Sequence, residues 1–339
     1  MIRLGVAAGG TGGHIIPALR VAKSLEASGA SVVWFGRDNS LESRIAKRYG
    51  IDFVAFDAML AGLSFKQLPK YLGKVTRQVW VVRRLLKEHR ITCLFATGAY
   101  VSIIPALSAK SMNIPLVIHE QNTYMGRANK LLSLISNQVC LGMPLQGRSR
   151  GNSVLVGNPV TGSIPKKEGH HILVIGGSQG SQFLNITLPE ILFQCGIKDQ
   201  VIHIAGDGHE AVSERYQHLG ISALVHRFVD DLRPLYHDAK LVISRAGAMT
   251  LAEIIHHRVP SILIPYPFAT HDHQKKNAEY LVNAFAAICV EEDASQLKKA
   301  FLKLFSSIYL RNSLRLSLGK LAKPNAVEDI TRLIQKEHT

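Results

Sequence analysis

The chain has 339 residues. A single hydrophobic core does not usually support a chain of that length, so the length predicts two domains of roughly 150 residues each. Its 47% hydrophobic and 19% charged residues exclude a disordered or collagen-like chain. The formal net charge of +15 lies mostly in residues 1–157, where 20 Lys and Arg face 7 Asp and Glu, and it suggests nucleic acid, an anionic membrane surface or a phosphorylated substrate as partner.

The N-terminus runs directly into an apolar strand and a glycine loop, without the pattern of an export signal. The four cysteines form no C-x-x-C pair, which excludes the usual zinc-ribbon, thioredoxin and disulfide patterns, and a reducing cytoplasm fits best. Gly98 and Pro105 interrupt the uncharged stretch between Arg90 and Lys110. We therefore expect a strand, a turn and a helix there rather than a membrane span.

The N-terminal half alternates short β-branched runs with longer amphipathic segments, which predicts parallel βαβ units. The expected strands are Leu4–Ala8, Ser31–Phe35, Phe53–Phe56, Cys93–Ala96, Leu116–His119 and Val139–Leu141.

The same alternation restarts in the C-terminal half. The expected strands are Ile172–Ile175, Val201–Ile204, Ala223–His226, Leu241–Ser244, Ser261–Ile264 and Ala287–Val290, with helices near Gly180–Gln194, Ala248–His257 and Asp272–Val282. The fold class is therefore α/β, with two doubly wound parallel sheets in domains 1–158 and 159–339. A last helix is expected over 325–336; it could pack on either domain, and the N-terminal domain is the candidate.

Each half opens with a strand, a glycine loop and a helix, an arrangement that lets backbone N–H groups approach an anion or a sugar. The first loop, GGTGGH, lacks the G-x-G-x-x-G spacing, because position 15 is Ile15. His14 stands where the loop meets the helix, at the edge where open α/β sheets bind ligands. It is a candidate general base, with a helix-capping or surface role as the alternative.

The segment SRAGAMTLAE follows another strand and opens a helix, so free N–H groups near Ala248–Thr250, beside Arg245, form a candidate diphosphate site. Glu253, one turn further, suits a ribose diol, although a solvated helix glutamate is the alternative. His271, Asp272 and His273 are more consistent with helix-capping residues than with metal ligands, because consecutive helix positions point in different directions. No D-x-D, G-x-S-x-G or P-loop sequence occurs.

Taken together, these motifs closely resemble those of the MurG family, which are peptidoglycan glycosyltransferases of glycosyltransferase family 28. The matching segments follow the family order over nearly the whole chain: GGTGGHIIPAL (9–19), GAYVS (98–102), HEQN (119–122), ANK (128–130), GNPV (157–160), GGSQGS (176–181) with Leu184 and Asn185, FVDDL (228–232), SRAGAMTLAE (244–253), and the HQ and NA of HDHQKKNA. The resemblance implies the GT-B arrangement, two Rossmann-like domains facing across a cleft, with UDP-GlcNAc held mainly by the second.

Carried over by matching motif, the implied donor contacts lie in both halves. They are Thr11, Gly12, Gly13 and Asn122 at the sugar end, Ser178 in the second glycine loop, Val229 through its backbone at the uracil, Ala248, Met249, Thr250, Leu251, Ala252 and Glu253 around the diphosphate and ribose, and Gln274 at the sugar hydroxyls, with Arg245 and Asn277 as further substrate-binding residues.

The expected reaction is an inverting, metal-independent transfer of N-acetylglucosamine to the C4 hydroxyl of a lipid-linked MurNAc-pentapeptide, without a cofactor. His14 is the expected base and Glu120 a weaker base or its orienting partner. Two alternatives are a GT-B transferase acting on diacylglycerol, which HEQN and GAYVS disfavour, and a non-catalytic basic nucleotide- or nucleic-acid-binding protein. The chain shows no RRM, KH or helix-turn-helix signature, so nucleic acid is not the expected partner.

Two positions depart from the family pattern. Thr161 stands where the family usually has arginine after GNPV, so a charged contact near the donor is missing or comes from elsewhere, with Lys166 and Lys167 as candidates. Ala99 replaces the second glycine of GGYVS, which requires a backbone conformation that tolerates a Cβ atom.

The segment from Lys66 to Arg90 has a net charge of +7 and predicts a helix from about Pro69. An apolar stripe of Leu72, Val75, Val79, Val82 and Leu86 should pack on the sheet, whereas Lys70, Arg77, Trp80, Arg84 and Lys87 share another face. We expect that face to bind anionic lipid, placing the protein peripherally on the cytoplasmic face of the bacterial inner membrane. An ordinary solvated face is the alternative.

Overall fold

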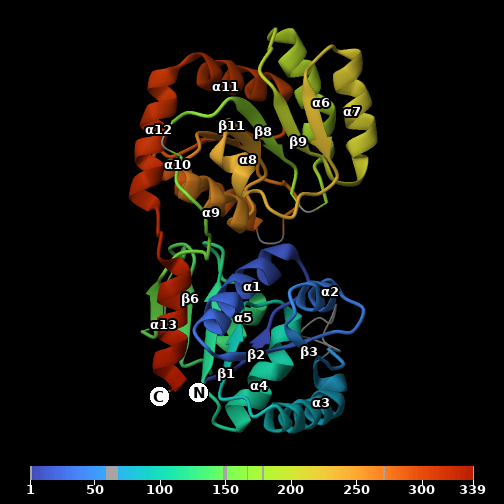
Figure 1. Cartoon of the computed structure of the whole chain (residues 1–339), viewed down its shortest axis with the longest axis vertical. Helices are drawn as coiled ribbons and strands as arrows, with labels where there is room; N and C mark the ends of the chain where they lie inside the picture. The colour runs from blue at the N-terminus through green and yellow to red at the C-terminus, as the bar shows by residue number, and fades with distance from the viewer. Residues whose placement is uncertain are drawn as a thin grey trace. The chain divides into compact units, whose positions relative to one another are not determined.

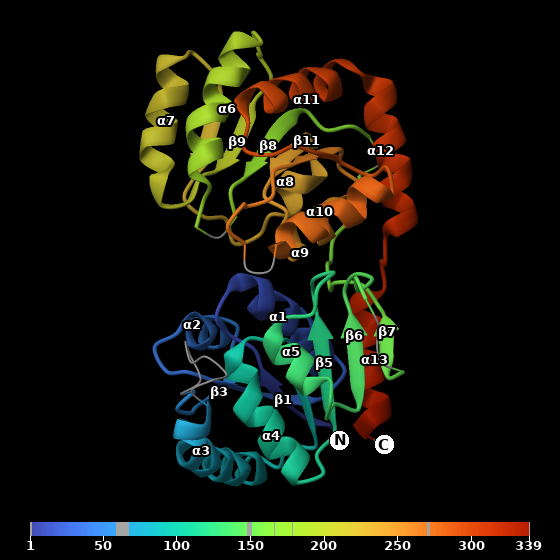
Figure 2. The ribbon, with the colours of Figure 1, turned by 180° about the vertical axis from the view of Figure 1, so that it is seen from behind.

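A computed structural model describes residues 2–58, 68–147, 151–165, 167–177, 179–269 and 272–338, apart from the side chains of residues 68–70 and 72. The chain divides into two compact units, shown from two sides in Figures 1 and 2. Unit 1 comprises residues 1–159 together with 325–339, and unit 2 comprises residues 160–324. The last helix therefore belongs with the N-terminal residues.

Unit 1 is built on a seven-stranded parallel sheet in the order β3-β2-β1-β4-β5-β6-β7. The strands are β1 (Arg3–Ala7), β2 (Ser31–Gly36), β3 (Asp52–Ala55), β4 (Cys93–Ala96), β5 (Leu116–Glu120), β6 (Gln138–Leu141) and β7 (Ser153–Leu155). The strand order reverses between β1 and β4, and such a switch point opens a crevice at the carboxyl ends of the strands.

Helices cover both faces of this sheet. They are α1 (Gly12–Ala27), α2 (Leu41–Arg48), α3 (Leu68–Glu88), the short helix η2 (Tyr100–Ser102), α4 (Ile103–Ser111), α5 (Arg127–Leu132) and α13 (Ala326–His338). One buried cluster joins the sheet to α1, α2 and α13, and the other joins it to α3, α4 and α5. Helix α13 packs against α1, with Ile330 and Ile334 fully buried.

Unit 2 repeats this design with a six-stranded parallel sheet in the order β10-β9-β8-β11-β12-β13. The strands are β8 (His171–Ile175), β9 (Val201–Ile204), β10 (Ala223–His226), β11 (Ala239–Ser244), β12 (Ser261–Leu263) and β13 (Ile288–Cys289). The helices are α6 (Gln182–Gln194), η3 (Gly206–Gly208), α7 (His209–His218), α8 (Arg233–His237), α9 (Ala248–His257), α10 (His273–Asn283), α11 (Ala294–Ser306) and α12 (Ile308–Leu321).

The predicted fold class is confirmed, since both sheets are parallel and helices connect successive strands within each sheet, except between β6 and β7, where the described residues form no helix. Strand β7 was not predicted, because its three residues lie at the edge of the sheet with mostly exposed side chains. Among the described residues, no helix is both long and apolar enough to cross a membrane.

Candidate functional site

The first glycine loop connects β1 to the N-terminus of α1. Gly10 has a φ of +87°, a conformation that favours glycine. A Cβ atom on Gly9 would lie 2.8 Å from the carboxyl group of Glu42, which is fully buried beneath the loop. Thr11 is the N-cap of α1, and its side chain makes no capping hydrogen bond. The loop therefore leaves the predicted contacts Thr11, Gly12 and Gly13 at a partly exposed helix N-terminus.

His14, in the first turn of α1, is half-buried and held through one ring nitrogen. Its Nδ1 lies 2.9 Å from the carbonyl oxygen of Thr97 and 3.0 Å from Oε1 of Gln121. Both partners are acceptors, so Nδ1 carries the proton and Nε2 keeps its lone pair. This arrangement suits a general base.

Glu120 does not have the predicted orienting role. Its carboxylate is buried and accepts hydrogen bonds from the backbone and side-chain N–H groups of Asn122 and from Gly126 N and Asn129 Nδ2, at 2.9–3.1 Å. The ring of His14 bonds instead to Thr97 and Gln121 among the described residues. Glu120 thus organises the loop after β5, including the predicted sugar contact Asn122, and its engaged oxygens disfavour it as a base.

The backbone of Ala99 has a strained conformation and not one that readily tolerates a Cβ atom. Its φ of 62° and ψ of 165° lie in a region that is essentially restricted to glycine. Its Cβ lies 3.6 Å from the position that a Cβ would take on Gly10. The GAYVS segment therefore keeps the backbone of a GGYVS segment at a conformational cost.

The second glycine loop, after β8, is equally tight. A Cβ on Gly180 would lie 2.1 Å from the carbonyl oxygen of Ala205, and one on Gly176 would lie 2.5 Å from Ser181 N. Ser181 caps α6 by accepting a hydrogen bond from Leu184 N. Ser178, the predicted contact in this loop, lies outside the described residues.

Helix α9 begins after Gly247, with Ala248, Met249 and Thr250 partly exposed at its N-terminus. Leu251 is fully buried and packs in the core, so only its backbone faces the turn. Arg245 is engaged elsewhere than predicted. Its guanidinium donates to the carbonyl oxygen of Ile264 at 3.2 Å and pairs closely with Glu292. That pairing leaves less of its charge for a diphosphate.

Two predicted substrate-binding residues on α10, Gln274 and Asn277, differ in accessibility. Gln274 is half-buried, and its Oε1 accepts from Ala246 N at 3.2 Å and Tyr266 N at 3.0 Å. These bonds fix the amide and direct its Nε2 donor elsewhere. Asn277 is fully buried and donates to the carbonyl oxygen of Ala246 at 3.3 Å, so it supports this turn rather than facing a ligand.

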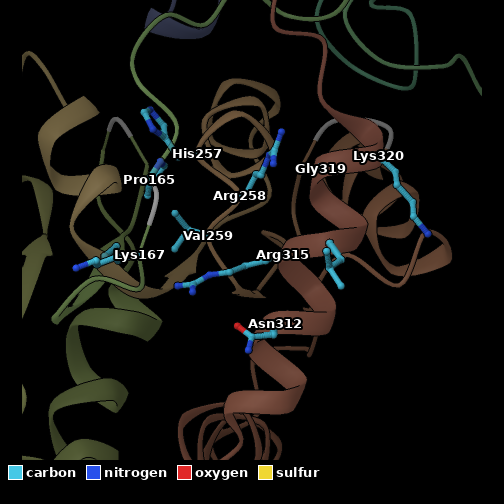
Figure 3. A pocket seen from close by; sticks show the side chains of 11 residues that line it. Pro165, Lys167, His257, Arg258, Val259, Asn312, Arg315, Gly319 and Lys320 are labelled. Carbon is cyan, nitrogen blue, oxygen red and sulfur yellow. The ribbon is translucent and has the colours of Figure 1, made fainter.

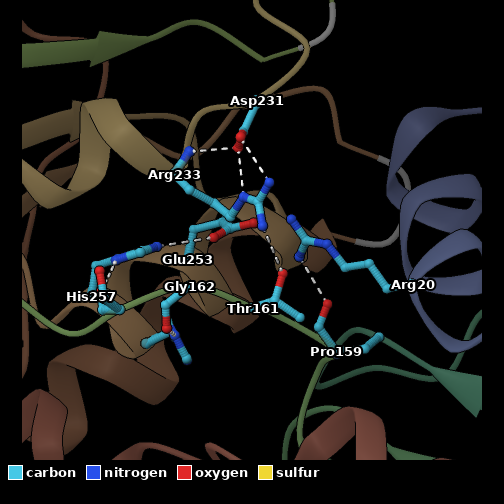
Figure 4. A network of polar contacts seen from close by, with 10 residues as sticks. Arg20, Pro159, Thr161, Gly162, Asp231, Arg233, Glu253 and His257 are labelled. Atoms are coloured by element: carbon cyan, nitrogen blue, oxygen red, sulfur yellow. Dashed lines mark hydrogen bonds and ion pairs between the residues drawn. The ribbon is translucent and has the colours of Figure 1, made fainter. Parts of the chain in front are cut away.

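A polar network surrounds Thr161 in unit 2 (Figure 4). Arg233 is held by Asp231, with Nε–Oδ1 and Nη2–Oδ2 distances of 2.7 and 2.8 Å, and its Nη1 lies 3.5 Å from Thr161 Oγ1. The carboxyl group of Glu253 points toward the same guanidinium, and its Oε2 lies 3.6 Å from His257 Nε2. A guanidinium within 3.5 Å of Thr161 thus comes from Arg233, a residue that was not predicted from the sequence.

Lys166 and Lys167 were the predicted sources of the positive charge that Thr161 lacks, and neither is found beside Thr161 among the described residues. Lys166 lies outside the described residues. Lys167 lines a cavity of about 700 Å³ beside α12, together with Arg258, Arg315 and Lys320, and its side chain extends away from His257 (Figure 3). Arg315 is paired with Glu168 at 3.5 Å.

The stretch from His271 to His273 was considered as a metal site. His271 lies outside the described residues, and Asp272 precedes α10 with a φ of 54°. Among the described residues, no group of three His, Cys, Asp or Glu side chains is placed to hold a metal ion.

The partners of His14, Thr97 and Gln121, were not predicted from the sequence. Thr97 directly precedes Gly98, the first residue of GAYVS, and Gln121 stands inside HEQN between Glu120 and Asn122, which were both predicted site residues. The spacing of HEQN could have indicated Gln121, because its position just after β5 places it at the sheet edge that carries His14. The Thr97 contact is through the backbone and leaves no residue-specific signal.

Solved structures with the same architecture cover the whole chain. The crystal structure of Acinetobacter baumannii MurG aligns with a TM-score of 0.84 at 29% identity, covering 99% of this chain and all of the other. The glycotransferase of kitacinnamycin aligns with a TM-score of 0.75 at 14% identity, which shows the fold alone. The two parallel α/β units and these likenesses define a glycosyltransferase of the GT-B fold.

Sequence comparison narrows this class. The N-terminal domain of glycosyltransferase family 28 matches residues 4–141, and its C-terminal domain matches residues 171–323. A protein of Psychromonas ingrahamii is 35% identical, with 97% of this chain and 96% of the relative covered, and one of Xanthomonas axonopodis pv. citri is 36% identical, with 98% and 81% covered. Both are named UDP-N-acetylglucosamine–N-acetylmuramyl-(pentapeptide) pyrophosphoryl-undecaprenol N-acetylglucosamine transferase. The chain belongs to glycosyltransferase family 28.

Proposed function

We propose that this chain transfers N-acetylglucosamine from UDP-GlcNAc to the C4 hydroxyl of undecaprenyl-pyrophosphoryl-MurNAc-pentapeptide in peptidoglycan synthesis. The observation that carries the proposal is the likeness to transferases of that name, which covers 97–98% of this chain and spans both units. The relatives reported above are named for neither alternative, a diacylglycerol transferase or a non-catalytic nucleotide-binding protein.

Within this reaction, His14 is the proposed general base. The acceptor hydroxyl is a weak nucleophile, and its proton must leave as the new glycosidic bond forms on the face opposite UDP. The lone pair on Nε2 accepts that proton. The resulting imidazolium is then stabilised by the two oxygens already bound to its Nδ1–H group.

The proposed donor site lies in unit 2. The N–H groups at the start of α9 and in the loop at 176–181 would meet the developing charge on the departing diphosphate, which we propose needs no metal ion. Val229 would contact the uracil and Glu253 the ribose. Arg233, four residues after Val229, is the proposed source of the guanidinium that Thr161 cannot supply.

The lipid-linked acceptor suggests peripheral membrane binding, for which α3 is the proposed surface. Its buried face carries Val82 and Leu86, whereas Trp80 is 68% exposed. Arg77, Arg84 and Lys87 are also exposed, and the guanidinium of Arg83 lies 4.7 Å from the centroid of the Trp80 ring. Lys66, where the predicted basic segment begins, lies outside the described residues. The side chains of Lys70 and Leu72 are not described either. We propose binding at the cytoplasmic face of the inner membrane.

The proposed function is tested by incubating the purified protein with UDP-GlcNAc and a lipid-linked MurNAc-pentapeptide and identifying the product by mass spectrometry. Formation of the lipid-linked disaccharide is the expected result. Parallel reactions contain diacylglycerol as the acceptor or lack an acceptor. Transfer to diacylglycerol alone, or UDP-GlcNAc binding without transfer to either lipid, would support one of the alternatives instead.

A further inference from the structure

We propose that Gln121 is a positioning residue that fixes the tautomer of His14 and so keeps the basic lone pair on Nε2. This inference deepens the proposed function, because it rests on His14 acting as the base. Its starting point is the 3.0 Å contact between Gln121 Oε1 and His14 Nδ1 in unit 1. The carbonyl oxygen of Thr97 shares the same proton.

The orientation of the Gln121 amide is determined by its other contacts. Gln121 is buried, and its Nε2 lies 3.1 Å from the carbonyl oxygen of Thr97 and 3.2 Å from that of His119. Carbonyl oxygens only accept, so exchanging the amide oxygen and nitrogen would place two oxygens against Oε1. Oε1 must therefore face His14, where it can only accept.

His119 extends this chain of hydrogen bonds into the core. Its Nε2 donates to the carbonyl oxygen of Gly157 at 3.2 Å, and its Nδ1 accepts from Gln121 Nε2 at 3.1 Å. Complete burial lowers the pKa of His119 to about 4, so the ring stays neutral and keeps its acceptor nitrogen at neutral pH. Donation thus runs in one direction, from His14 through Gln121 and His119 to the carbonyl oxygen of Gly157, and the two hydrogens of Gln121 Nε2 are shared among three acceptors.

The consequence for catalysis lies in the alternative tautomer. With the proton on Nε2, Nδ1 would direct its lone pair at the Thr97 and Gln121 oxygens, which is repulsive, and Nε2 could not accept a proton. Both oxygens favour a proton on Nδ1 and also stabilise the charged ring after proton uptake. Because Gln121 is uncharged, it does so through the dipole of its amide rather than through a negative charge beside the ring.

The test compares Gln121→Met, which removes the acceptor, with Gln121→Glu, which places a negative charge on the His14 Nδ1–H group. Gln138→Met is the control, since it makes the same chemical change on β6, where the amide bonds to Asn152. For Gln121→Met we expect a fall in kcat of roughly tenfold with an almost unchanged KM for UDP-GlcNAc, because one neutral hydrogen bond is lost. For Gln121→Glu we expect the acid limb of the kcat–pH profile to move up by about one unit or more.

A second measurement does not depend on turnover. Ring ¹⁵N NMR of the protein without substrates reports the tautomer of His14, and the signal is assigned by its loss in His14→Ala. We expect the Nδ1–H form in the wild type and in Gln138→Met, and a larger share of the Nε2–H form in Gln121→Met.

An unchanged tautomer in folded Gln121→Met, or an unmoved pH profile in folded Gln121→Glu, would overturn the role of Gln121. Absence of transfer by the wild type, with the Nδ1–H form present, would count against the proposed function alone. If Gln121→Glu does not fold, the NMR comparison of wild type and Gln121→Met decides.

Discussion

The Nδ1 atom of His14 lies 2.9 Å from the carbonyl oxygen of Thr97, so a backbone group that mutation cannot remove holds the proposed base. Replacing His14 by alanine leaves this support intact and deletes only the proton acceptor. We expect kcat for GlcNAc transfer to fall roughly 10²- to 10⁴-fold, with UDP-GlcNAc binding retained. Steady-state kinetics and calorimetric titration measure the two quantities. Near wild-type turnover of His14→Ala would assign the base elsewhere.

The contact between Arg233 and Thr161 predicts a suppressor pair. In Arg233→Ala the proposed guanidinium at the donor is lost, and we expect KM for UDP-GlcNAc to rise about tenfold, which corresponds to one charge-assisted hydrogen bond. Adding Thr161→Arg to that variant returns a guanidinium to the same place and should recover most of the loss.

Arg215→Ala is the matched control for this pair, because it breaks an exposed ion pair with Glu190 in the same unit. We expect its KM to stay at the wild-type value. If Arg233→Ala also leaves KM unchanged, Arg233 does not contact the donor. If KM rises but Thr161→Arg gives no recovery, the effect of Arg233 passes through Asp231 or Glu253 instead.

The fold was predictable from the sequence because its signals are local. Buried parallel strands give short β-branched runs, and β4, β9 and β10 have the predicted bounds. Helix α9 also begins and ends as predicted. The ends of other elements shifted by one or two residues, where hydrogen bonding between strands, rather than the residue type, sets the limit. Strand β7 shows the same effect at the sheet edge.

The site was less predictable, because its details depend on contacts between distant segments. Motif spacing selected Glu120 and Arg245. The conformation of the following loop, up to Asn129, engages the carboxylate of Glu120, and Glu292, 47 positions away, engages the guanidinium of Arg245. Conversely, Arg233 lies beside Thr161 only in the folded chain, because the two residues are 72 positions apart in the sequence. Sequence patterns thus predicted which loops form the candidate site, but the hydrogen-bond and ion-pair partners of its residues depend on the folded structure.

The backbone of Ala99 predicts that a glycine would stabilise unit 1. Its φ of 62° and ψ of 165° cost about 1–3 kcal/mol for a residue with a Cβ, whereas glycine loses only about 0.5–1 kcal/mol more conformational entropy on folding. We expect Ala99→Gly to raise the free energy of unfolding by about 1 kcal/mol, measured by urea denaturation. Ala27→Gly, at the exposed end of α1, should lower it instead. A loss of stability in Ala99→Gly would contradict the strain.

Two buried histidines predict that stability falls in mild acid. Burial lowers the pKa of His119 to about 4 and that of His203 to about 3, from the ordinary 6.5, one in each unit. Below pH 6.5 the unfolded chain takes up protons that the folded chain does not, so stability is present above that pH and is lost as the pH falls. At pH 5 the loss is about 2 kcal/mol for each histidine, relative to pH 7.

Urea denaturation at pH 7 and pH 5 measures this difference. His203→Phe should reduce the pH dependence of unit 2, because the replacement cannot take up a proton in either state. Equal stability at the two pH values would show that neither ring is neutral and buried as described.

Helix α3 predicts salt-dependent binding to anionic membranes. Arg77, Arg84 and Lys87 are exposed near Trp80, and each cation at an anionic surface contributes about 1 kcal/mol, although Arg84 contributes less because it pairs with Glu88 at 2.7 Å. We expect the protein to sediment with vesicles that contain an anionic lipid but not with neutral ones. It should be released in 1 M salt, where charges are screened within about 3 Å. Changing all three residues to glutamate should abolish sedimentation.

The control for this charge reversal is Lys299, Lys303 and Lys320 changed to glutamate, three exposed lysines of unit 2 that give the same change in net charge. If both triple variants lose binding equally, total charge rather than α3 determines the contact. Equal binding of the wild type to neutral vesicles would show that the contact is chiefly hydrophobic. In that case Trp80→Ser, which removes the exposed ring and keeps the cations, should release the protein where the charge reversal does not.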